Sequence, residues 1–234
     1  MKQAKTEGPV VQLIGVSKIF QGINRETAVL KDISFSAYAG EMVLVLGPSG
    51  SGKSTFLTIL AGLQEPTSGE VWLFGHALNS YSSVALQRLR ASRIGFIFQT
   101  FHLIDALNAL ENILLVLKFT HTRLKAARAR AIALLEQFGV GYLADAMPRT
   151  MSQGEKQRVA VARALANNAT LIIADEPTGS LSTEQGMHIV RLLQEEAKKG
   201  NRCVILASHD QRITEYADRV LYLKDGIITD KPFF

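Results

Sequence analysis

Residues 47–54 read Gly-Pro-Ser-Gly-Ser-Gly-Lys-Ser and match the pattern G-x-x-x-x-G-K-[ST] at every fixed position. The apolar run 42–46 precedes them, and residues 55–61, which contain no helix breaker, follow. This context predicts a strand, a glycine-rich loop and a helix, in that order. Such a loop turns backbone N–H groups toward phosphate oxygens, and the helix N-terminus adds partial positive charge. A chance glycine-rich turn is the alternative, and the flanking elements disfavour it.

Each loop residue then has an expected position. Lys53 should reach the β- and γ-phosphates of a nucleotide, and the Ser54 hydroxyl should bind Mg²⁺. The residues expected around the phosphates are Gly47, Pro48, Ser49, Gly50, Ser51, Gly52, Lys53, Ser54 and Thr55.

Composition is that of an ordinary soluble globular chain, with 47% hydrophobic and 20% charged residues among 234. No run approaches the ~18 apolar residues of a membrane span. Residues 1–8 lack the apolar segment of a signal peptide, and we expect residues 1–9 to form a flexible tail. The single Cys203 lies in an apolar run and is expected to be buried. These features predict a cytoplasmic location.

The net charge of +5 is too mild to indicate nucleic-acid binding. One segment is more basic: Lys118, Arg123, Lys125, Arg128 and Arg130 occur with no acidic residue among them. A solvated helix face explains this pattern, and contact with anionic lipid headgroups or an acidic partner is the functional alternative.

The rest of the chain alternates between strand and helix patterns. Helices are predicted over residues 106–138, 155–166, 183–199 and, briefly, 211–217. Asp225-Gly226 predicts a hairpin turn near the end. Alternation around a phosphate loop predicts an α/β fold with a mostly parallel sheet and helices on both faces. Strands are predicted at residues 10–14, 29–38, 42–46, 70–74, 93–98, 171–174, 204–207 and 220–223.

Two adjacent carboxylates end the apolar run 171–174. Consecutive side chains on a strand point to opposite faces, so Asp175 can face Mg²⁺ while the chain turns at Pro177 and directs Glu176 elsewhere. Glu176 is then a candidate general base for an attacking water. A surface Asp-Glu pair is the plainer interpretation, and the upstream phosphate loop weighs against it.

Residues 151–155 read Met-Ser-Gln-Gly-Glu just before a helical pattern. Ser152 and Glu155 have the spacing of a capping box, which would explain both side chains structurally. A capped helix N-terminus with exposed N–H groups is also an anion site.

Through these motifs, the chain resembles the ATP-binding subunits of ABC transporters over residues 10–228. The resemblance rests on five motifs in order: the phosphate loop, Gln99, residues 151–155, Asp175-Glu176 and residues 208–210. Segments 93–99 and 174–179 are similar to the lipoprotein-release and macrolide-export group.

The resemblance implies a role for each matching residue. Phe20 occupies the place of the aromatic that stacks on adenine, usually a tyrosine. Gln99 would bind Mg²⁺ together with Ser54 and Asp175, and it would sense the γ-phosphate. Ser152 and Gly154 would bind the γ-phosphate of ATP held by a second subunit. The catalytic residues would be Glu176, His209, Lys53 and Gln99, with His209 contacting the γ-phosphate.

Three positions depart from the family pattern. Met151 replaces a leucine and Gln153 replaces a glycine, changes that the family tolerates. Ser182 stands where an aspartate normally helps to couple the two sites of a dimer. We therefore expect ATP binding to persist and coupling between the sites to differ.

The resemblance also implies an assembly. Residues 10–234 would form one ATPase domain: a P-loop core, an antiparallel β-subdomain and a helical subdomain at about 100–168. Two copies would bury two Mg-ATP, each between a phosphate loop and residues 151–155, the signature motif of the family. A separate integral membrane permease would bind near residues 100–104. The chain would lie on the cytoplasmic face of the inner membrane.

Two other functions remain open from the sequence. Related ATPases drive membrane partners that control cell-wall enzymes, and such an ATPase chain would look almost the same. A soluble ABC-type ATPase acting on DNA or ribosomes is the second alternative. The chain has no coiled-coil insertion, no zinc-finger cysteines and a single ATPase domain, so nucleic acid is not expected as a partner.

Overall fold

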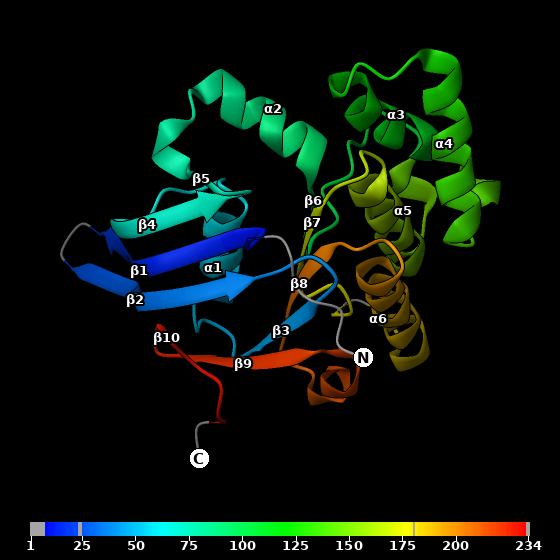
Figure 1. The fold of residues 1–234 in the computed structure, drawn as a ribbon. Coiled ribbons are helices and arrows are strands. Elements are labelled where there is room, and N and C mark those ends of the chain that lie inside the picture. Colours follow the sequence, from blue (N-terminus) through cyan, green and yellow to red (C-terminus); the bar gives the residue numbers. More distant parts are fainter. Residues whose placement is uncertain (1–7, 23–24, 180, 233–234) are drawn as a thin grey trace, which may run out of the picture.

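The computed structural model describes residues 8–22, 25–179 and 181–232. Most of the predicted tail, residues 1–7, lies outside the described residues. Two sheets and the helices around them make up the fold, with the antiparallel sheet and the helical region at opposite sides of the molecule (Figure 1). This arrangement confirms the predicted α/β fold.

The larger sheet has the order β10-β9-β3-β8-β7-β6. Strands β9, β3, β8, β7 and β6 run parallel, and β10 pairs antiparallel with β9. The strand bounds are β3 Met42–Leu46, β6 Ile94–Ile97, β7 Leu171–Asp175, β8 Cys203–Ser208, β9 Arg219–Lys224 and β10 Ile227–Thr229.

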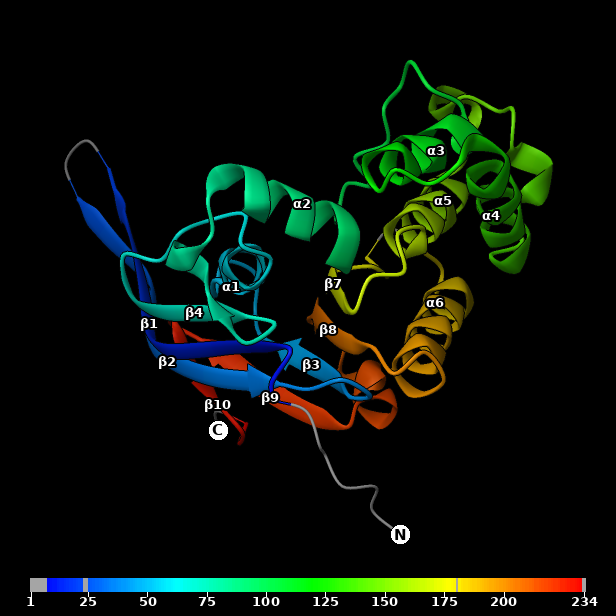
Figure 2. The ribbon, with the colours of Figure 1, turned by 45° about the horizontal axis from the view of Figure 1, so that its top comes forward.

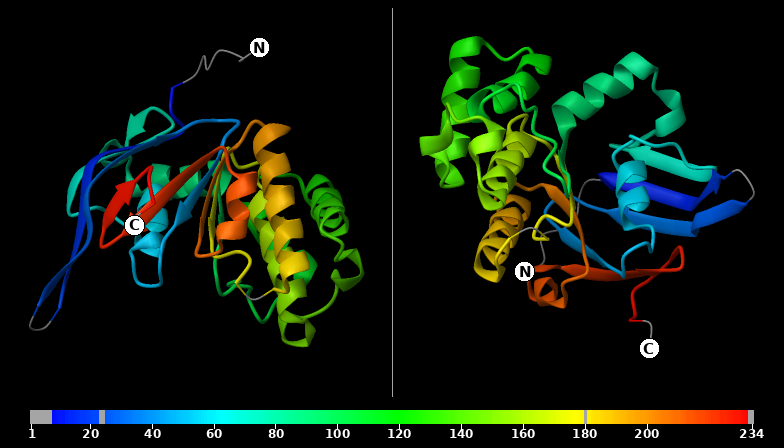
Figure 3. Two further views of the ribbon diagram at one scale, coloured as in Figure 1. Left: turned by 90° about the horizontal axis from the view of Figure 1, so that it is seen from below. Right: turned by 180° about the vertical axis from the view of Figure 1, so that it is seen from behind.

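Both faces of this sheet are buried, which explains why its central strands are continuous apolar runs. Val43, Val45 and Ile173 face a core shared with α1 (Lys53–Leu60) and the smaller sheet. Leu44 and Ile172 face the second core, against the helices. Helix α1 contacts both sheets (Figure 2), and α5 and α6 lie on the other side of the parallel strands (Figure 3).

The smaller sheet is antiparallel, with the order β2-β1-β4-β5. Its strands are β1 Val11–Gln21, β2 Glu26–Ala37, β4 Ser68–Leu73 and β5 His76–Ala77. Alternating residues of β1, Val11 and Leu13, point into the core, while Ile14 is exposed. A one-sided pattern of this kind is usual for an antiparallel sheet with one solvated face.

The described residues form five further α-helices and four 3-10 helices. Among the described residues, no helix is both long enough and apolar enough to cross a membrane. The α-helices are α2 Ser83–Arg93, α3 Ala109–Phe119, α4 Leu124–Gln137, α5 Gln153–Leu165 and α6 Thr183–Lys198. The 3-10 helices are η1 Leu78–Ser80, η2 Gly141–Leu143, η3 Pro148–Thr150 and η4 Gln211–Tyr216.

The observed helices differ from the predicted ones in two places. The predicted helix over 106–138 is two helices, α3 and α4, separated by a turn in which His121 has φ 54°. The short helix predicted over 211–217 is present as the 3-10 helix η4. Helix α2 was not predicted, because none of its residues is fully buried and it therefore lacks a strong apolar stripe.

Candidate functional site

The phosphate loop connects β3 to α1, as predicted. Gly52 is the N-cap of α1 with φ 103° and no side-chain cap, and Gly50 has φ 79°. Both values fall in the left-handed region that favours glycine. A Cβ on Gly47 would lie 2.2 Å from the Leu223 carbonyl oxygen, so only glycine fits there. The first N–H groups of α1 are therefore left for an anion.

Strand order brings the other motifs to this loop. Strand β8 pairs with both β3 and β7, with Leu46 opposite Ser208 and Asp175 opposite Ala207. The carboxyl ends of three parallel strands thus meet at one edge of the sheet. Residues more than 100 positions apart in the chain, such as Lys53 and Glu176, become neighbours there.

A cavity of about 370 Å³ opens at this edge. Val29 and Gly179 contribute to its wall. Of the predicted site residues, it is lined by Ser49, Gly50, Gly52, Lys53, Ser54, Thr55, Gln99, Asp175, Glu176 and His209.

Glu176 lies at the centre of a polar cluster. Its Oε1 is 3.5 Å from Lys53 Nζ, and its Oε2 is 3.0 Å from His209 Nδ1 and accepts from Ser208 Oγ at 3.4 Å. Lys53 Nζ also donates to the carbonyl oxygens of Gly47 at 2.8 Å and Pro48 at 3.0 Å. The loop lysine thus lies folded over its own loop and beside the candidate base.

The backbone of Glu176 is unusual. Its φ of 46° lies in the left-handed region, which is costly for a residue with a Cβ. The Glu176 N–H donates to the Ala207 carbonyl oxygen at 2.9 Å, which continues the β7–β8 pairing by one residue. This turn at the end of β7 directs Glu176 toward His209 and Lys53, as the sequence predicted in outline.

Asp175 offers an oxygen for a cation. It is buried, and its carboxylate accepts a hydrogen bond from the Ser54 hydroxyl. Its Oδ1 has no hydrogen-bond partner. Burial raises the pKa of Asp175 above its ordinary value, and the hydroxyl of Ser54 opposes that shift. A hydroxyl, an amide at Gln99 and a free carboxylate oxygen form a hard oxygen set that fits Mg²⁺, which takes few protein ligands and completes its shell with phosphate and water. The described residues contain no cluster of three or more His, Cys, Asp or Glu suited to a metal.

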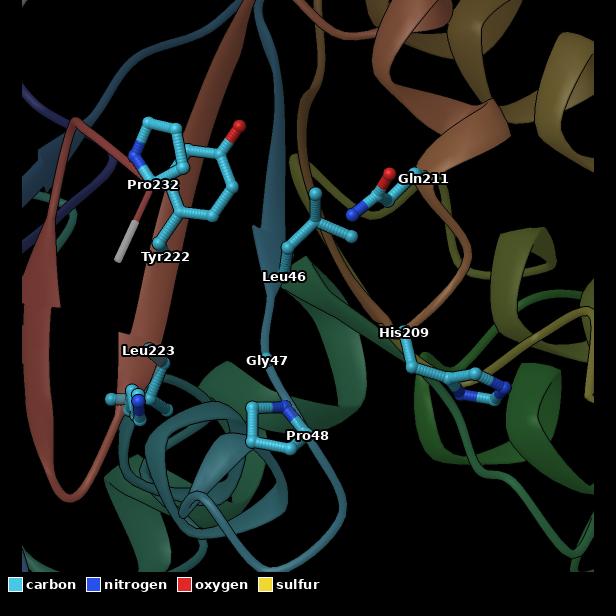
Figure 4. Close-up of a pocket in the computed structure, with 9 residues that line it drawn as sticks. Leu46, Gly47, Pro48, His209, Gln211, Tyr222, Leu223 and Pro232 are labelled. Carbon is cyan, nitrogen blue, oxygen red and sulfur yellow. The ribbon is translucent and has the colours of Figure 1, made fainter. Parts of the chain in front are cut away.

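A second cavity, of about 380 Å³, lies on the other side of the loop (Figure 4). Gly47 and Pro48 line it together with Tyr222 of β9, and Pro232 approaches from the C-terminal segment. His209 borders both cavities and its side chain is 65% exposed. Its ring is therefore reachable from outside the cluster, while Ser51, the remaining loop residue, is buried.

The signature lies on a different element. Ser152 is the N-cap of α5, and the predicted capping box with Glu155 is present. Gly154 packs near Gln185 of α6. Tyr142, which the sequence did not single out, donates its hydroxyl to Glu155 Oε1 at 2.6 Å and holds the pKa of Glu155 below its ordinary value. Ser152 and Gly154 do not line the cavity at the phosphate loop.

Phe20 lies near the end of β1, where it pairs with Thr27 of β2. The residue is 41% exposed, and Lys18 Nζ lies 5.2 Å from the ring centroid. An exposed aromatic face is available for stacking, although Phe20 does not line the phosphate-loop cavity.

Arg163 of α5 is a further residue that the sequence did not reveal. Its guanidinium donates to the Phe101 carbonyl at 2.7 Å and also to the His102 carbonyl. Those two residues have φ 60° and 46°, so one half-buried cation holds a strained turn just after Gln99. Burial lowers the pKa of Arg163 to about 10. Arginine in an apolar-patterned helix carries no sequence signal for such a role.

Comparison with known proteins agrees with this geometry. Residues 30–179 match the ABC transporter family. The chain is 41% identical over 218 residues to the putative hemin import ATP-binding protein HrtA of Staphylococcus haemolyticus, covering 93% of this chain and 98% of that protein. It is 39% identical over 220 residues to the macrolide export ATP-binding/permease protein MacB of Agrobacterium fabrum. That alignment covers 94% of this chain and 34% of MacB, so the chain spans about a third of the MacB relatives' length.

Solved structures agree as well. The ATP-binding cassette MJ0796, in a dimeric post-hydrolysis state bound to ADP and Pi, superposes with a TM-score of 0.89 at 36% identity. The superposition covers 95% of this chain and 100% of that one. A phosphate loop, a carboxylate pair and a histidine at one sheet edge, within a fold shared over nearly the whole chain, identify the molecule. The chain belongs to the ABC transporter family and is one of its nucleotide-binding ATPase cassettes.

Proposed function

We propose that this chain is the ATP-hydrolysing subunit of a membrane transporter, and that ATP-driven pairing of two copies powers a separate permease. One observation carries the proposal. Lys53, Asp175 and Glu176 converge on one cavity, whereas Ser152 and Gly154 lie at the start of α5, outside it. A single copy would therefore hold only part of the expected γ-phosphate contacts, and a second copy would supply the rest. Residues 10–234 would act as one cassette, with 100–168 as its helical part.

The chain's own groups suggest how hydrolysis proceeds. Free N–H groups at the start of α1 would bind phosphate oxygens, and Lys53 would exchange the carbonyls of Gly47 and Pro48 for the β- and γ-phosphates. Glu176 would accept the proton of the attacking water. Ser54, Asp175 and Gln99 would hold Mg²⁺, which supplies charge neutralisation to the phosphates.

His209 would act through a change of partner. Since a carboxylate only accepts, the contact with Glu176 requires a proton on Nδ1 of His209. In the neutral ring Nε2 is then an acceptor, which a phosphate oxygen would repel. Contact between His209 and a γ-phosphate therefore needs either a second proton on the ring or release of Glu176 by the ring. Release of Glu176 would free its carboxylate to act as the base.

The name of one relative suggests that the permease is a separate protein. HrtA is named an ATP-binding protein and is covered almost completely, while MacB carries ATP-binding and permease parts in one longer chain. The permease would bind in a groove of about 280 Å³ next to Gln99, lined by His102, Ile104, Val116 and Phe119. An apolar wall with a few polar groups suits a short amphipathic helix of the permease. The chain would then lie at the cytoplasmic face of the membrane.

The test is to purify the tagged chain from membranes in mild detergent and identify what accompanies it. An integral membrane protein that raises the ATPase rate supports the proposal. A partner that controls cell-wall enzymes would favour mechanical signalling, and ribosomes or DNA would favour the soluble alternative. The proposal would be contradicted if the chain purified without a partner and, as a single copy in the presence of ATP, hydrolysed ATP at its full rate.

Ser182→Asp is expected to change the cooperativity of hydrolysis more than the affinity for ATP. Ser182 is the exposed N-cap of α6 and accepts from the Gln185 N–H at 3.4 Å. Aspartate caps equally well, so the fold should be unchanged. The added carboxylate would be available to the second copy. Hill coefficients of hydrolysis against ATP concentration, with the permease present, would be compared for both proteins. Coinciding coefficients and rates would mean that the serine is neutral.

A further inference from the structure

The turn between α3 and α4 forms a basic and apolar surface that the proposed ATPase mechanism does not use. No Asp or Glu occurs between Glu111 and Glu136. Lys118, Arg123, Lys125 and Arg128 are exposed, as are the side chains of Phe119, at 59%, and Leu124, at 76%. We call these six residues the corner surface.

Arg130, the fifth cation of the basic segment, does not belong to this surface. Its Nη2 donates to the Leu165 carbonyl at 2.9 Å and to Asn168 Oδ1 at 2.6 Å, at the end of α5. Burial lowers its pKa below the ordinary arginine value. Arg130 therefore stabilises the packing of α4 on α5. None of the four cations of the corner surface has an ion pair among the described residues.

We propose that the corner surface binds the headgroups of anionic lipids at the membrane beside the permease. Four cations without acidic neighbours in the segment complement a negatively charged bilayer surface. Phe119 and Leu124 fit the same occupant, because large apolar tips between Lys and Arg can enter the headgroup–acyl boundary. A purely polar acidic peptide would leave these two apolar side chains exposed to water.

The position of the surface supports this occupant. Phe119 lines the groove proposed to hold the permease helix and also belongs to the corner surface. This step rests on the proposed function, since the groove would bring Phe119 close to the bilayer. The long stems of Lys118, Arg123, Lys125 and Arg128 can extend their charges sideways to lipid phosphates. Weak binding suffices, because the permease already holds the chain at a high local concentration.

Vesicle binding tests the proposal with the full 234-residue chain. The wild-type chain should sediment with vesicles of equal parts phosphatidylglycerol and phosphatidylcholine, and much less with phosphatidylcholine alone. Each surface cation should contribute about fivefold to binding, so R123Q/K125Q should bind the anionic vesicles about 25-fold less well. Leu124→Ser should weaken binding about threefold to tenfold. Raising the salt from about 0.1 M to about 1 M should release the wild type, since the Debye length falls from about 10 Å to about 3 Å.

The matched control is K31Q/K231Q, which removes the same charge from two exposed lysines outside the helical region. It should bind anionic vesicles like the wild type. Equal losses in the two double variants would mean net-charge attraction and would overturn the proposal. Failure of the wild-type chain to bind anionic vesicles would also overturn the proposal. If R123Q/K125Q no longer co-purifies with the permease, and the wild-type chain binds no vesicles, the lipid proposal is wrong. The corner surface would then bind an acidic protein segment.

A last measurement separates this proposal from the proposed function. ATPase activity in detergent should be the same for R123Q/K125Q and the wild type, because the corner surface lies outside the nucleotide site. Normal activity with lost vesicle binding supports the lipid site. If no membrane partner stimulates the ATPase activity of the wild-type chain, the proposed function is contradicted. This outcome does not depend on the result of the vesicle assay.

Discussion

Glu176→Gln is expected to slow ATP hydrolysis by about 10²–10⁴-fold, the usual effect of losing a general base. The amide is nearly isosteric with the carboxylate but cannot accept the proton of water. ATP affinity should be retained or increased, because Lys53 Nζ, now 3.5 Å from Glu176 Oε1, would no longer be attracted to a carboxylate. Phosphate release measures the rate, and calorimetry with Mg-ATP measures the affinity.

The same variant tests the dimer. With hydrolysis blocked, Glu176→Gln should elute at twice the single-chain mass in Mg-ATP and at the single-chain mass without it. Glu136→Gln, an exposed glutamate of α4, is the matched control and should behave as wild type. Near wild-type turnover in the Glu176 variant would show that another group accepts the proton.

Lys53→Ala is expected to weaken Mg-ATP binding by about 10–100-fold, which corresponds to the ~1.5–3 kcal/mol of a hydrogen bond to a charged group. Hydrolysis should fall further, because the same ammonium stabilises the charge of the transition state. Lys53 is buried and donates to two loop carbonyls, so Lys53→Met serves as a second variant that preserves the packing.

Calorimetry gives the affinity, and the rise in melting temperature on adding Mg-ATP gives an independent value, since a ligand that binds only the native state stabilises it by mass action. Lys31→Ala, on the exposed side of β2, is the control and should show the wild-type shift. Unchanged ATP affinity in both Lys53 variants would exclude Lys53 from the site.

The site follows from the sequence where local rules apply. The glycine-rich loop, the buried strand before it and the capping box at Ser152 are local patterns, and the structure contains all three. Asp175 and Glu176 were also singled out from the sequence, because the upstream phosphate loop weighed against a plain surface pair, and their roles stay predictions. The roles assigned by resemblance to Phe20, Gln99 and His209 stay predictions.

The errors lie where neighbours in space decide the structure. Helix α2 has no fully buried residue, so its sequence lacks the apolar periodicity that marks a helix. The break between α3 and α4 contains no glycine or proline, and His121 adopts a positive φ there that local propensity does not indicate. Arg130 was expected on a solvated helix face and Arg163 was not singled out, yet both donate to backbone carbonyls of distant segments.

The amino-acid sequence by itself determined the local elements and their chemistry: a phosphate loop, a carboxylate pair and a capped helix, since these depend on backbone conformation and strand period within a few residues. Only the tertiary structure decided which of them share a cavity. The strand order β3-β8-β7 brings Lys53, Glu176 and His209 together and leaves Ser152 on another element. That order results from burying both faces of one sheet, which is a property of the whole chain.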